Sequence, residues 1–600
     1  MSNLGKQTDN IKQLQGEMQK KGIDWYLIPT ADYHDSEYVT DYFKGREFIS
    51  GFTGSNGTLL VSQNWAGLWT DGRYFIQAEQ ELKGTGITLY KMQEMGVPTI
   101  LAYLEEKVTS GQVLAYDGLV TGVKMGLQLE ERLKDKSIVI RYEEDLLSSI
   151  WTDRPAFPHQ KIVVLPEEIS GEKASAKIAK VRSQLIESGA DYLLLTKLDD
   201  IMWLLNLRGS DIPCNPVALS YVFLSKQEIY LFVQSEAITA ALTSYTVQEG
   251  ICLQDYRTIL SFLQQYDYGG SVALDKEHMN VTLYQTIRKR AEVLFMDNPT
   301  SLWKAQKNQT EQQNMRAVYL RDSVAVTKFI YWVKKTVPTK KITEMDAAEY
   351  LDALRKQTEG FLDLSFPTIS AYLEHAAMMH YQATTETNKS LEPKGSLLVD
   401  SGGQYRGGTT DVTRTIALGP LTDAFCTHFT YVLQGMLRLQ NARFLYGCTG
   451  RNLDILARSP LWNQEMDYKC GTGHGIGYML NVHEGPQSIR WSYDKELPEI
   501  ILEEGMVLSN EPGVYIEHAY GIRTENIMLC QKGHKNIDGQ FMYFEPLTYV
   551  PIDREAIKSS LLSQEDRQRL DEYHAQVSKR ISPYLNAEEK AWLQEVTAAI

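Results

Sequence analysis

Cysteine is scarce in this sequence, and its scarcity limits the class of protein. Only six cysteines occur in 600 residues, and none of them form a paired spacing. A fold that depends on disulfides carries more cysteines, at regular spacings. We therefore expect free thiols in a reducing compartment, and the predicted location is the cytoplasm.

Long apolar runs are also missing. No stretch approaches the ~18 consecutive apolar residues that a membrane-spanning helix needs. The first 18 residues are polar and predict an amphipathic helix. They lack the apolar core and the small-residue cleavage site of a secretory signal peptide. We expect no membrane segment and no leader.

An excess of positive charge is absent as well. The chain has 61 Lys and Arg against 76 Asp and Glu, a net charge of −15. Proteins that bind nucleic acid present a basic surface, so we expect no nucleic-acid partner. An acidic surface mainly keeps a protein in solution, and it can also attract cationic peptides.

The length predicts about three or four domains, and the first half contains two similar α/β patterns. Residues 48–55 (FISGFTGS) also align with residues 203–210 (WLLNLRGS), which favours an internal repeat over chance similarity. The first pattern includes a predicted helix at 74–82. The predicted strands are 24–29, 57–62 and 67–72 in the first pattern, and 191–196, 217–225 and 229–233 in the second.

Two junctions divide the chain. The Pro-containing segment 151–160 is a predicted linker, and a second junction falls at 301–310. There, Thr310 and Gln313 form a capping-box pattern that predicts the start of a long helix. Its predicted apolar positions include Met315, Val318, Phe329, Ile330 and Val333. The predicted domains are 1–158, 159–308 and 309–600.

Five residues of the last third define the chemistry, because each lies in a short Gly- or Thr-rich motif. Four carboxylates and one imidazole can hold two divalent cations, and two such cations can share one water molecule. The resulting bridging hydroxide is a strong nucleophile near neutral pH, as amide hydrolysis requires. The sequence therefore predicts a two-metal hydrolase. The five residues are Asp400, Asp411, His474, Glu511 and Glu525.

Asp400 and Asp411 are predicted to come from one hairpin. Asp400 ends the apolar strand SLLVD, Asp411 begins the strand DVTRTIAL, and Gly-rich residues 401–410 lie between them. An isolated Asp beside a turn is usually a turn former or a cap. An Asp inside a β-branched strand is out of place without a partner, which favours the metal interpretation.

The other three ligands follow in glycine-containing or apolar contexts. The glycines around His474 give backbone freedom and clear space for the imidazole. The alternative, a dinucleotide-binding turn, lacks the strand–turn–helix unit that it needs. Glu511 follows an apolar strand, and Glu525 lies in another, where a buried Glu requires a cation or a proton. Arg523 is the alternative cation for Glu525.

The third domain resembles the pita-bread fold shared by methionine aminopeptidase, prolidase, creatinase and aminopeptidase P. The resemblance is closest to the three-domain form of X-prolyl aminopeptidase (aminopeptidase P), and it covers essentially the whole chain. It implies an α/β fold with two creatinase-like N-terminal domains before a pita-bread catalytic domain. The motifs that carry the resemblance, in order, are LSFPTIS, HY (380–381), LLVDSGGQY, GTTDVTRT, GTGHGIG, NVHEGP, EPGVY, GIRTEN and FEPLTYVPID.

The resemblance also implies the arrangement of the metals, which it gives as two divalent cations. Asp400 would chelate one metal, Asp411 and Glu525 would bridge both, and His474 and Glu511 would bind the other. The oxygen-rich ligand set favours borderline-hard ions, and the resemblance points to manganese. The implied reaction is removal of the N-terminal residue from peptides with proline in second position, by a homodimer.

Further roles are implied for residues around the metals. Glu511 would be the general base, His380 would lie near the scissile nitrogen, and His483 would hydrogen-bond the carbonyl oxygen. Arg523 would line the active-site wall. Cys470 departs from the family, which often has His there to line the pocket for the substrate proline, so the preference of that subsite is in question.

Two alternatives to this function share the same motifs. A prolidase, restricted to X–Pro dipeptides, has the same ligands, but the extra N-terminal domain and the length speak against it. A catalytically silent pita-bread module that binds peptides or proteins is expected to have lost ligands, whereas all five are present here.

Overall fold

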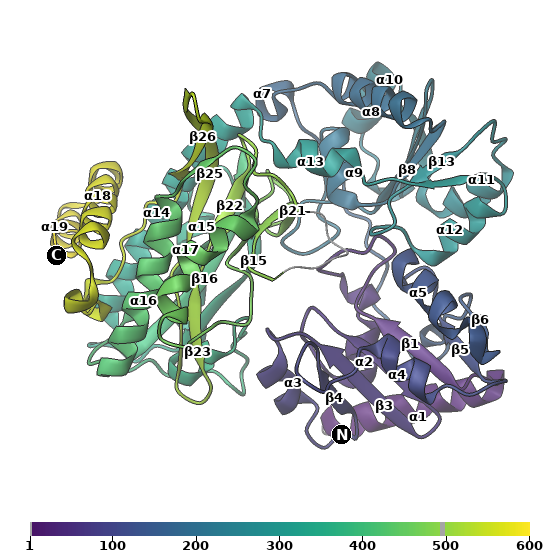
Figure 1. The fold of residues 1–600 in the computed structure, drawn as a ribbon, viewed down its shortest axis with the longest axis horizontal. Coiled ribbons are helices and arrows are strands. Elements are labelled where there is room, and N and C mark those ends of the chain that lie inside the picture. Colours follow the sequence, from purple (N-terminus) through teal and green to yellow (C-terminus); the bar gives the residue numbers. More distant parts are fainter. Residues whose placement is uncertain (1–2, 493–498) are drawn as a thin grey trace. The chain divides into compact units, whose positions relative to one another are not determined.

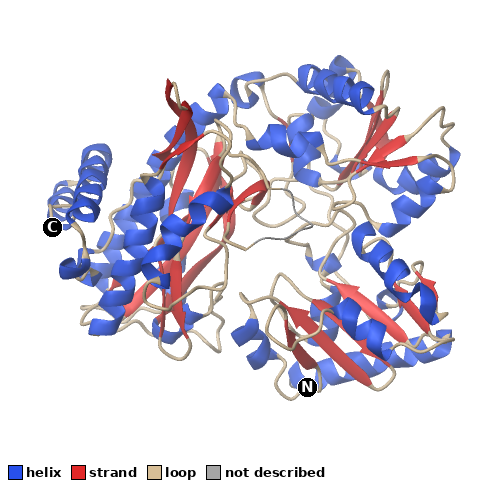
Figure 2. Cartoon of the chain, viewed as in Figure 1, coloured by secondary structure: helices blue, strands red, loops and turns tan. Residues whose placement is uncertain are grey.

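The structure, a computed structural model, describes residues 3–492 and 499–600. The chain folds into two compact units: Met1–Leu165 with Glu172–Thr300, and Pro166–Gly171 with Ser301–Ile600 (Figure 1). Helices and strands occur in both units, which confirms the α/β class (Figure 2). The predicted N-terminal helix is α1 (Asn3–Lys21), and residues 1–2 of that prediction lie outside the described part.

Within the described ranges, no helix combines the length and the apolar character needed to cross a bilayer. All six cysteines are free thiols, as predicted.

Two six-stranded sheets in the first unit have the same topology. When the strands of the two sheets are compared in order from one edge to the other, each pair of neighbouring strands is parallel or antiparallel in both sheets alike. The first sheet is β4 (Thr88–Lys91), β3 (Trp65–Thr70), β2 (Thr58–Ser62), β1 (Trp25–Pro29), β5 (Val113–Tyr116) and β6 (Val139–Arg141). The second is β12 (Cys252–Asp255), β11 (Ile229–Val233), β10 (Ser220–Ser225), β8 (Tyr192–Leu195), β13 (Val272–Leu274) and β14 (Val293–Phe295).

This shared topology supports the predicted repeat. The six predicted strands overlap β1, β2, β3, β8, β10 and β11, and the predicted helix is α3 (Phe75–Glu81). The aligned segments 48–55 and 203–210 overlap the ends of corresponding helices, α2 (Gly45–Ser50) and α9 (Leu198–Leu204), which follow β1 and β8. The domain boundaries at 158 and 308 remain predictions.

The four inner strands of the first sheet, β1, β2, β3 and β5, are largely buried on both faces, which explains their continuous apolar sequence. In β1, Tyr26 and Ile28 pack in one core with α1, including Leu14. The alternate residues Trp25 and Leu27 pack in a second core. Successive side chains of a strand point to opposite faces, so one run of residues serves both cores.

The long helix after the second junction is α14 (Gln309–Thr336), and its predicted capping box was wrong. Asn308 is the N-cap: its side chain accepts the N–H of Glu311 at 3.0 Å, and Glu311 returns the bond at 2.9 Å. Asn caps a helix at least as well as Thr, so the helix begins before Thr310. The five predicted apolar positions are buried.

The second unit contains two main sheets and a two-stranded ribbon, β23 (Gly513–Ile516) with β24 (Tyr520–Arg523). One sheet pairs β15 (Phe361–Tyr372), β16 (Ser396–Tyr405), β17 (Gly408–Thr409) and β18 (Val412–Ala417). The other has the order β19 (Arg443–Leu445), β26 (Gly539–Pro546), β25 (Asn526–Asn536), β22 (Val507–Asn510), β20 (Gly473–Gly475) and β21 (Glu484–Ile489).

Helices pack on these sheets and bury their apolar residues. One core joins α14 and α15 (Glu344–Lys356) to β16 and β18, with Phe329 and Leu351 meeting Leu397 and Ile416. A second joins α16 (Asp423–Gln440) and α17 (Gly450–Trp462) to the other sheet. The predicted ligands lie on and beside the strands that these cores support.

Candidate metal centre

One hairpin brings Asp400 and Asp411 to the same site, although its shape differs from the prediction. Asp400 lies in the middle of β16, paired with Thr413 of β18, and the strand continues to Tyr405. Asp411 lies one residue before β18 rather than inside it. A Cβ at Gly402 would meet the carbonyl oxygen of Thr410 at 1.9 Å. Gly402 therefore permits the two strands of the hairpin to pack closely. The prediction that the strand ends at Asp400 was wrong, because β16 continues to Tyr405.

His474 is the central residue of β20, between β21 and β22. A Cβ at Gly473 would lie 2.1 Å from the carbonyl oxygen of Ser509, so this glycine makes room for the neighbouring strand. The Nδ1 atom of His474 lies 2.9 Å from the carbonyl oxygen of Gly475. Because a carbonyl only accepts, Nδ1 carries the proton, and Nε2 presents its lone pair to the carboxylates.

The two glutamates are fixed by their backbone and by hydroxyl groups. Glu511 follows β22, and its N–H bonds the carbonyl oxygen of Thr472 at 2.8 Å. Glu525 lies in the link between β24 and β25, not inside a strand as predicted. Its N–H donates to the carbonyl oxygen of Thr413 at 3.1 Å, and its Oε2 accepts the Thr413 hydroxyl at 2.8 Å.

These side chains converge. The Nε2 of His474 lies 3.5 Å from Oδ2 of Asp411 and 3.3 Å from Oε1 of Glu511. Asp411, His474 and Glu525 each offer one ligand atom within 4.8 Å of the others. The charge of Asp400 acts on the neighbouring carboxyls as well. We call the set Asp400, Asp411, His474, Glu511 and Glu525 the metal cage; that each residue binds metal remains a prediction.

Burial, with a further contribution from neighbouring charges, disfavours the ionised forms of Asp411, Glu511 and Glu525. Burial, together with the charges of Glu525, Asp400 and Glu511, raises the pKa of Asp411 well above its usual range. Burial also raises the pKa of Glu525 well above its usual range. Burial raises the pKa of Glu511 to about 7, against the opposing charge of Arg523. Such a site is stable as anions only if cations neutralise it.

Two orphaned oxygens test whether cations fit. Oδ1 of Asp400 and Oε1 of Glu525 are buried and accept no hydrogen bond from the described residues. Leaving a buried acceptor unpaired costs about 1–3 kcal/mol, and more if it is charged. Carboxylate oxygens and one imidazole nitrogen are a donor set that divalent ions such as Mn²⁺ accept. The residues present therefore fit metal ions.

Arg523 is paired with Asp400 rather than with Glu525. Its Nη2 lies 2.6 Å from Oδ2 of Asp400 and 3.3 Å from the carbonyl oxygen of Met379. The remaining donors reach the hydroxyls of Tyr515 at 2.8 Å and Thr413 at 3.1 Å. Arg523 thus connects Asp400 of the metal cage to Tyr515 and Met379 beside it.

The remaining predicted residues surround the cage. The rings of His483 and His474 are 4.3 Å apart between centroids, at an angle of 75°. His380 follows Met379, whose carbonyl oxygen Arg523 contacts. Half-buried Cys470 packs beside the apolar core of α16 and α18 (Gln564–Ile581). Roles for these residues toward substrate remain predictions.

Sequence reasoning missed the hydroxyl groups that orient the ligands. The Ser509 hydroxyl accepts the N–H of His474 at 2.9 Å and donates to Oε1 of Glu511 at 3.1 Å. Thr413 does the same for Glu525 and Arg523. Both residues stand two positions from a ligand, in SNE and DVT, and that spacing is the clue that could have identified them.

Comparison with protein families divides the whole chain. Two segments, residues 10–143 and 153–311, each match the Creatinase/Prolidase N-terminal domain. Residues 313–532 match metallopeptidase family M24, and residues 540–600 match the C-terminal region of that family.

Individual relatives match over nearly the full length. Aminopeptidase P2 of Arabidopsis thaliana is 36% identical over 94% of this chain and 84% of its own. The X-prolyl aminopeptidase of Caenorhabditis elegans, described as a cytosolic enzyme with a di-nuclear active site, has a crystal structure with a TM-score of 0.94, 33% identity and full coverage of both chains. Prolidase from Pyrococcus horikoshii has the same fold at a TM-score of 0.50 and 22% identity, over 64% of this chain and all of that chain.

Proposed function

Because this chain belongs to metallopeptidase family M24, and within it to the Xaa-Pro aminopeptidases, we propose that it removes the N-terminal residue from peptides with proline second. The observation that carries this proposal is the full-length match to an X-prolyl aminopeptidase, which includes both N-terminal sheets. The X–Pro bond resists most peptidases, since proline has no N–H and a restricted backbone.

The metal cage is proposed to hold two divalent cations, with Mn²⁺ as the preferred ion. The orphaned oxygens of Asp400 and Glu525 and the mutual repulsion of the carboxyls support this assignment. When bound, the ions would lower the pKa of a water molecule enough for it to attack the scissile carbonyl carbon near neutral pH.

Residues of the chain itself would move the protons and stabilise the developing charge. Glu511 would take the proton from the attacking water and pass it to the leaving proline nitrogen. His483 would donate a hydrogen bond to the carbonyl oxygen as it becomes negative, and His380 would lie near the scissile nitrogen.

Arg523 and Cys470 are proposed to line the substrate side of the site. Arg523 would act from the wall that it forms with Tyr515. The thiol of Cys470 donates only weakly, so this wall offers the substrate proline an apolar contact in place of the imidazole that the family often has.

Location and assembly are also proposals. We propose that the enzyme works in the cytoplasm, since its cysteines are free and its C. elegans relative is a cytosolic enzyme. We propose a homodimer in which the C-terminal domain supplies much of the contact, and light scattering of the purified protein measures that state directly.

The test is turnover of Arg-Pro-Pro, Arg-Ala-Pro and Gly-Pro by the manganese-loaded protein. The proposal expects release of arginine from Arg-Pro-Pro. It expects at least about 100-fold less turnover of Arg-Ala-Pro, which lacks proline in second position, and of the dipeptide Gly-Pro, which lacks a third residue. Cleavage of Gly-Pro alone would make the protein a prolidase. Absence of any turnover, in a protein that binds no divalent ion, would make it a silent binding module.

A further inference from the structure

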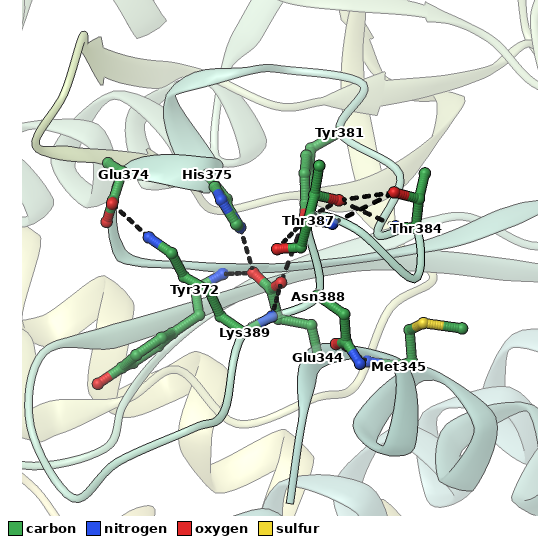
Figure 3. A network of polar contacts seen from close by, with 10 residues as sticks. All are labelled: Glu344, Met345, Tyr372, Glu374, His375, Tyr381, Thr384, Thr387, Asn388 and Lys389. Atoms are coloured by element: carbon green, nitrogen blue, oxygen red, sulfur yellow. Dashed lines mark hydrogen bonds and ion pairs between the residues drawn. The ribbon is translucent and has the colours of Figure 1, made fainter. Parts of the chain in front are cut away.

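We infer that Glu344 is a positioning residue for the reaction, because it holds the segment 372–389 that carries His380. This inference rests on the proposed function only through the role of His380. Glu344 opens α15, its side chain is fully buried, and Figure 3 shows it surrounded by residues of that segment. Within the described part of the chain, the Glu344 carboxylate forms no hydrogen bond or ion pair with a residue of the metal cage.

Four donors from the segment converge on the Glu344 carboxylate (Figure 3). Its Oε1 accepts the N–H of Tyr372 at 2.7 Å and lies 2.8 Å from Nδ1 of His375. Its Oε2 accepts the N–H of Lys389 at 2.9 Å and the hydroxyl of Tyr381 at 3.1 Å. One side chain therefore fixes both ends of the segment and two points between them.

The helix itself does not need this carboxylate. Thr343 is the N-cap of α15 and forms a capping box with Asp346, which satisfies the first turn. The N–H of Glu344 also bonds outside the helix, to the carbonyl oxygen of Lys389 at 3.0 Å. The side chain is thus committed to segment 372–389, which returns beside the start of α15.

The segment is connected to the metal cage at its centre. Met379 lies between His375 and Tyr381 in sequence, and its carbonyl oxygen accepts from Nη2 of Arg523 at 3.3 Å, the nitrogen that also bonds Asp400. A Cβ at Gly521 of β24 would lie 1.7 Å from the carbonyl oxygen of Ala376, so backbone meets backbone there. Movement of the segment would therefore shift His380 relative to Arg523 and Asp400.

The chemistry of the site specifies Glu. A carboxylate has only acceptors, and its two oxygens receive four donors here. In Glu344→Gln, the new NH₂ group would face either the backbone N–H of Tyr372 or that of Lys389, neither of which can turn away. Glu344→Asp keeps the charge but shortens the side chain by one methylene, so it reaches one end of the segment only.

The experiment compares Glu344→Gln with Glu349→Gln, an exposed position of the same helix with the same change of charge. We expect amide hydrogen exchange of residues 372–389 to accelerate at least about 10-fold in the first variant only, because one of the two backbone bonds is lost and the NH₂ group meets a second donor in its place. Turnover of Arg-Pro-Pro should show kcat reduced about 10-fold or more with KM changed less than about 3-fold, because His380 acts in the transition state.

A double-mutant cycle with His380→Ala separates positioning from a general structural role. If Glu344 acts through His380, adding Glu344→Gln to His380→Ala lowers kcat by less than about 2-fold, since the two changes are not additive. Tyr381→Phe, which removes one donor only, gives the same pattern at smaller size and serves if Glu344→Gln does not fold. Unchanged exchange, unchanged kcat, or additive losses would each overturn the inference. Failure of the wild type to cleave Arg-Pro-Pro would instead overturn the proposed function, and the exchange result would still decide whether Glu344 holds the segment.

Discussion

Glu344 and the metal cage are both buried acidic sites of the second unit, and they differ in what surrounds them. Glu344 carries one charge and receives four donors from segment 372–389. The metal cage gathers four carboxyls, of which Asp400 and Glu525 each keep an oxygen that accepts no hydrogen bond from the described residues. Arg523 supplies a single ion pair to that group, at Asp400.

This difference supports two proposed roles: Glu344 positions the backbone, and the carboxylates of the metal cage bind cations. Complete hydrogen bonding stabilises the ionised Glu344 without further partners. Incomplete bonding and mutual repulsion in the cage leave a requirement for positive charge that the protein does not meet itself. Changes at the cage should therefore affect chemistry and ion binding, whereas changes at Glu344 should affect the position of the backbone.

The largest effect is expected for Glu511→Gln. The amide can still accept the Ser509 hydroxyl, so the variant should fold, but it cannot take a proton from water. We expect kcat on Arg-Pro-Pro to fall about 10³-fold, within the 10²–10⁴ range of general base catalysis. This loss should exceed that of Glu344→Gln by a wide margin.

Glu517→Gln is the matched control for that variant, because Glu517 is exposed on the turn after β23. It should retain wild-type kcat. Near-normal turnover by Glu511→Gln would show that Glu511 does not transfer the proton. The proposed difference in function between Glu344 and the metal cage would then lose its main support.

Metal removal should have an intermediate effect, confined to the cage. An ion present at 100 times its dissociation constant stabilises the folded state by about 2.7 kcal/mol. Chelation should therefore lower the midpoint of thermal unfolding, and added Mn²⁺ should restore it, as scanning calorimetry can measure. Hydrogen exchange of Tyr372 and Lys389 should stay slow in the metal-free protein, because Glu344 needs no ion.

Two results would contradict this expectation. An unfolding midpoint that does not respond to chelation would mean that the cage is stable without cations. Rapid exchange at Tyr372 and Lys389 after chelation would mean that the two carboxylate groups are not independent.

The metal cage could be predicted from sequence because its residues break local rules. Asp411 precedes a β-branched strand, and Glu525 interrupts an apolar run, so each calls for an explanation beyond secondary structure. The repeated strands of the first unit were also predictable, since continuous apolar runs follow from burial on both faces. The capping box was placed wrongly because Asn308–Glu311 and Thr310–Gln313 satisfy nearly the same pattern.

Glu344 could not be predicted in the same way. The sequence TEMDAAEY is an ordinary helix start, and Thr343 with Asp346 accounts for it completely. The four donors come from residues 28 to 45 positions later in the chain. Only the folded arrangement of β15, segment 372–389 and α15 brings them together, so no local pattern distinguishes Glu344 from exposed Glu349.

The smallest effect concerns His34, an imidazole of the first unit that is bonded at both ring nitrogens and lies far in sequence from the metal cage. Its Nδ1 donates to the carbonyl oxygen of Thr196 and its Nε2 accepts from the Tyr256 hydroxyl, both at 2.8 Å. Burial lowers its pKa from 6.5 to about 3. Below pH 6.5 the unfolded chain binds a proton that the folded chain does not, so this contribution is complete above pH 6.5 and is lost as pH falls toward 3.

The expected loss is about 1.4 kcal/mol for each pH unit below 6.5. Asp32 accepts the backbone N–H of His34. Burial raises the pKa of Asp32 to about 6, so its effect on the free energy of unfolding changes with pH in the direction opposite to that of His34. Comparing His34→Gln with wild type cancels that term, since both proteins keep Asp32. Between pH 7 and pH 5.5, the midpoint temperature of thermal unfolding should fall less in His34→Gln than in the wild type. If the unfolding midpoint fell equally in the two proteins between pH 7 and pH 5.5, His34 would be protonated in the folded state. Its buried site would then accept a positive charge.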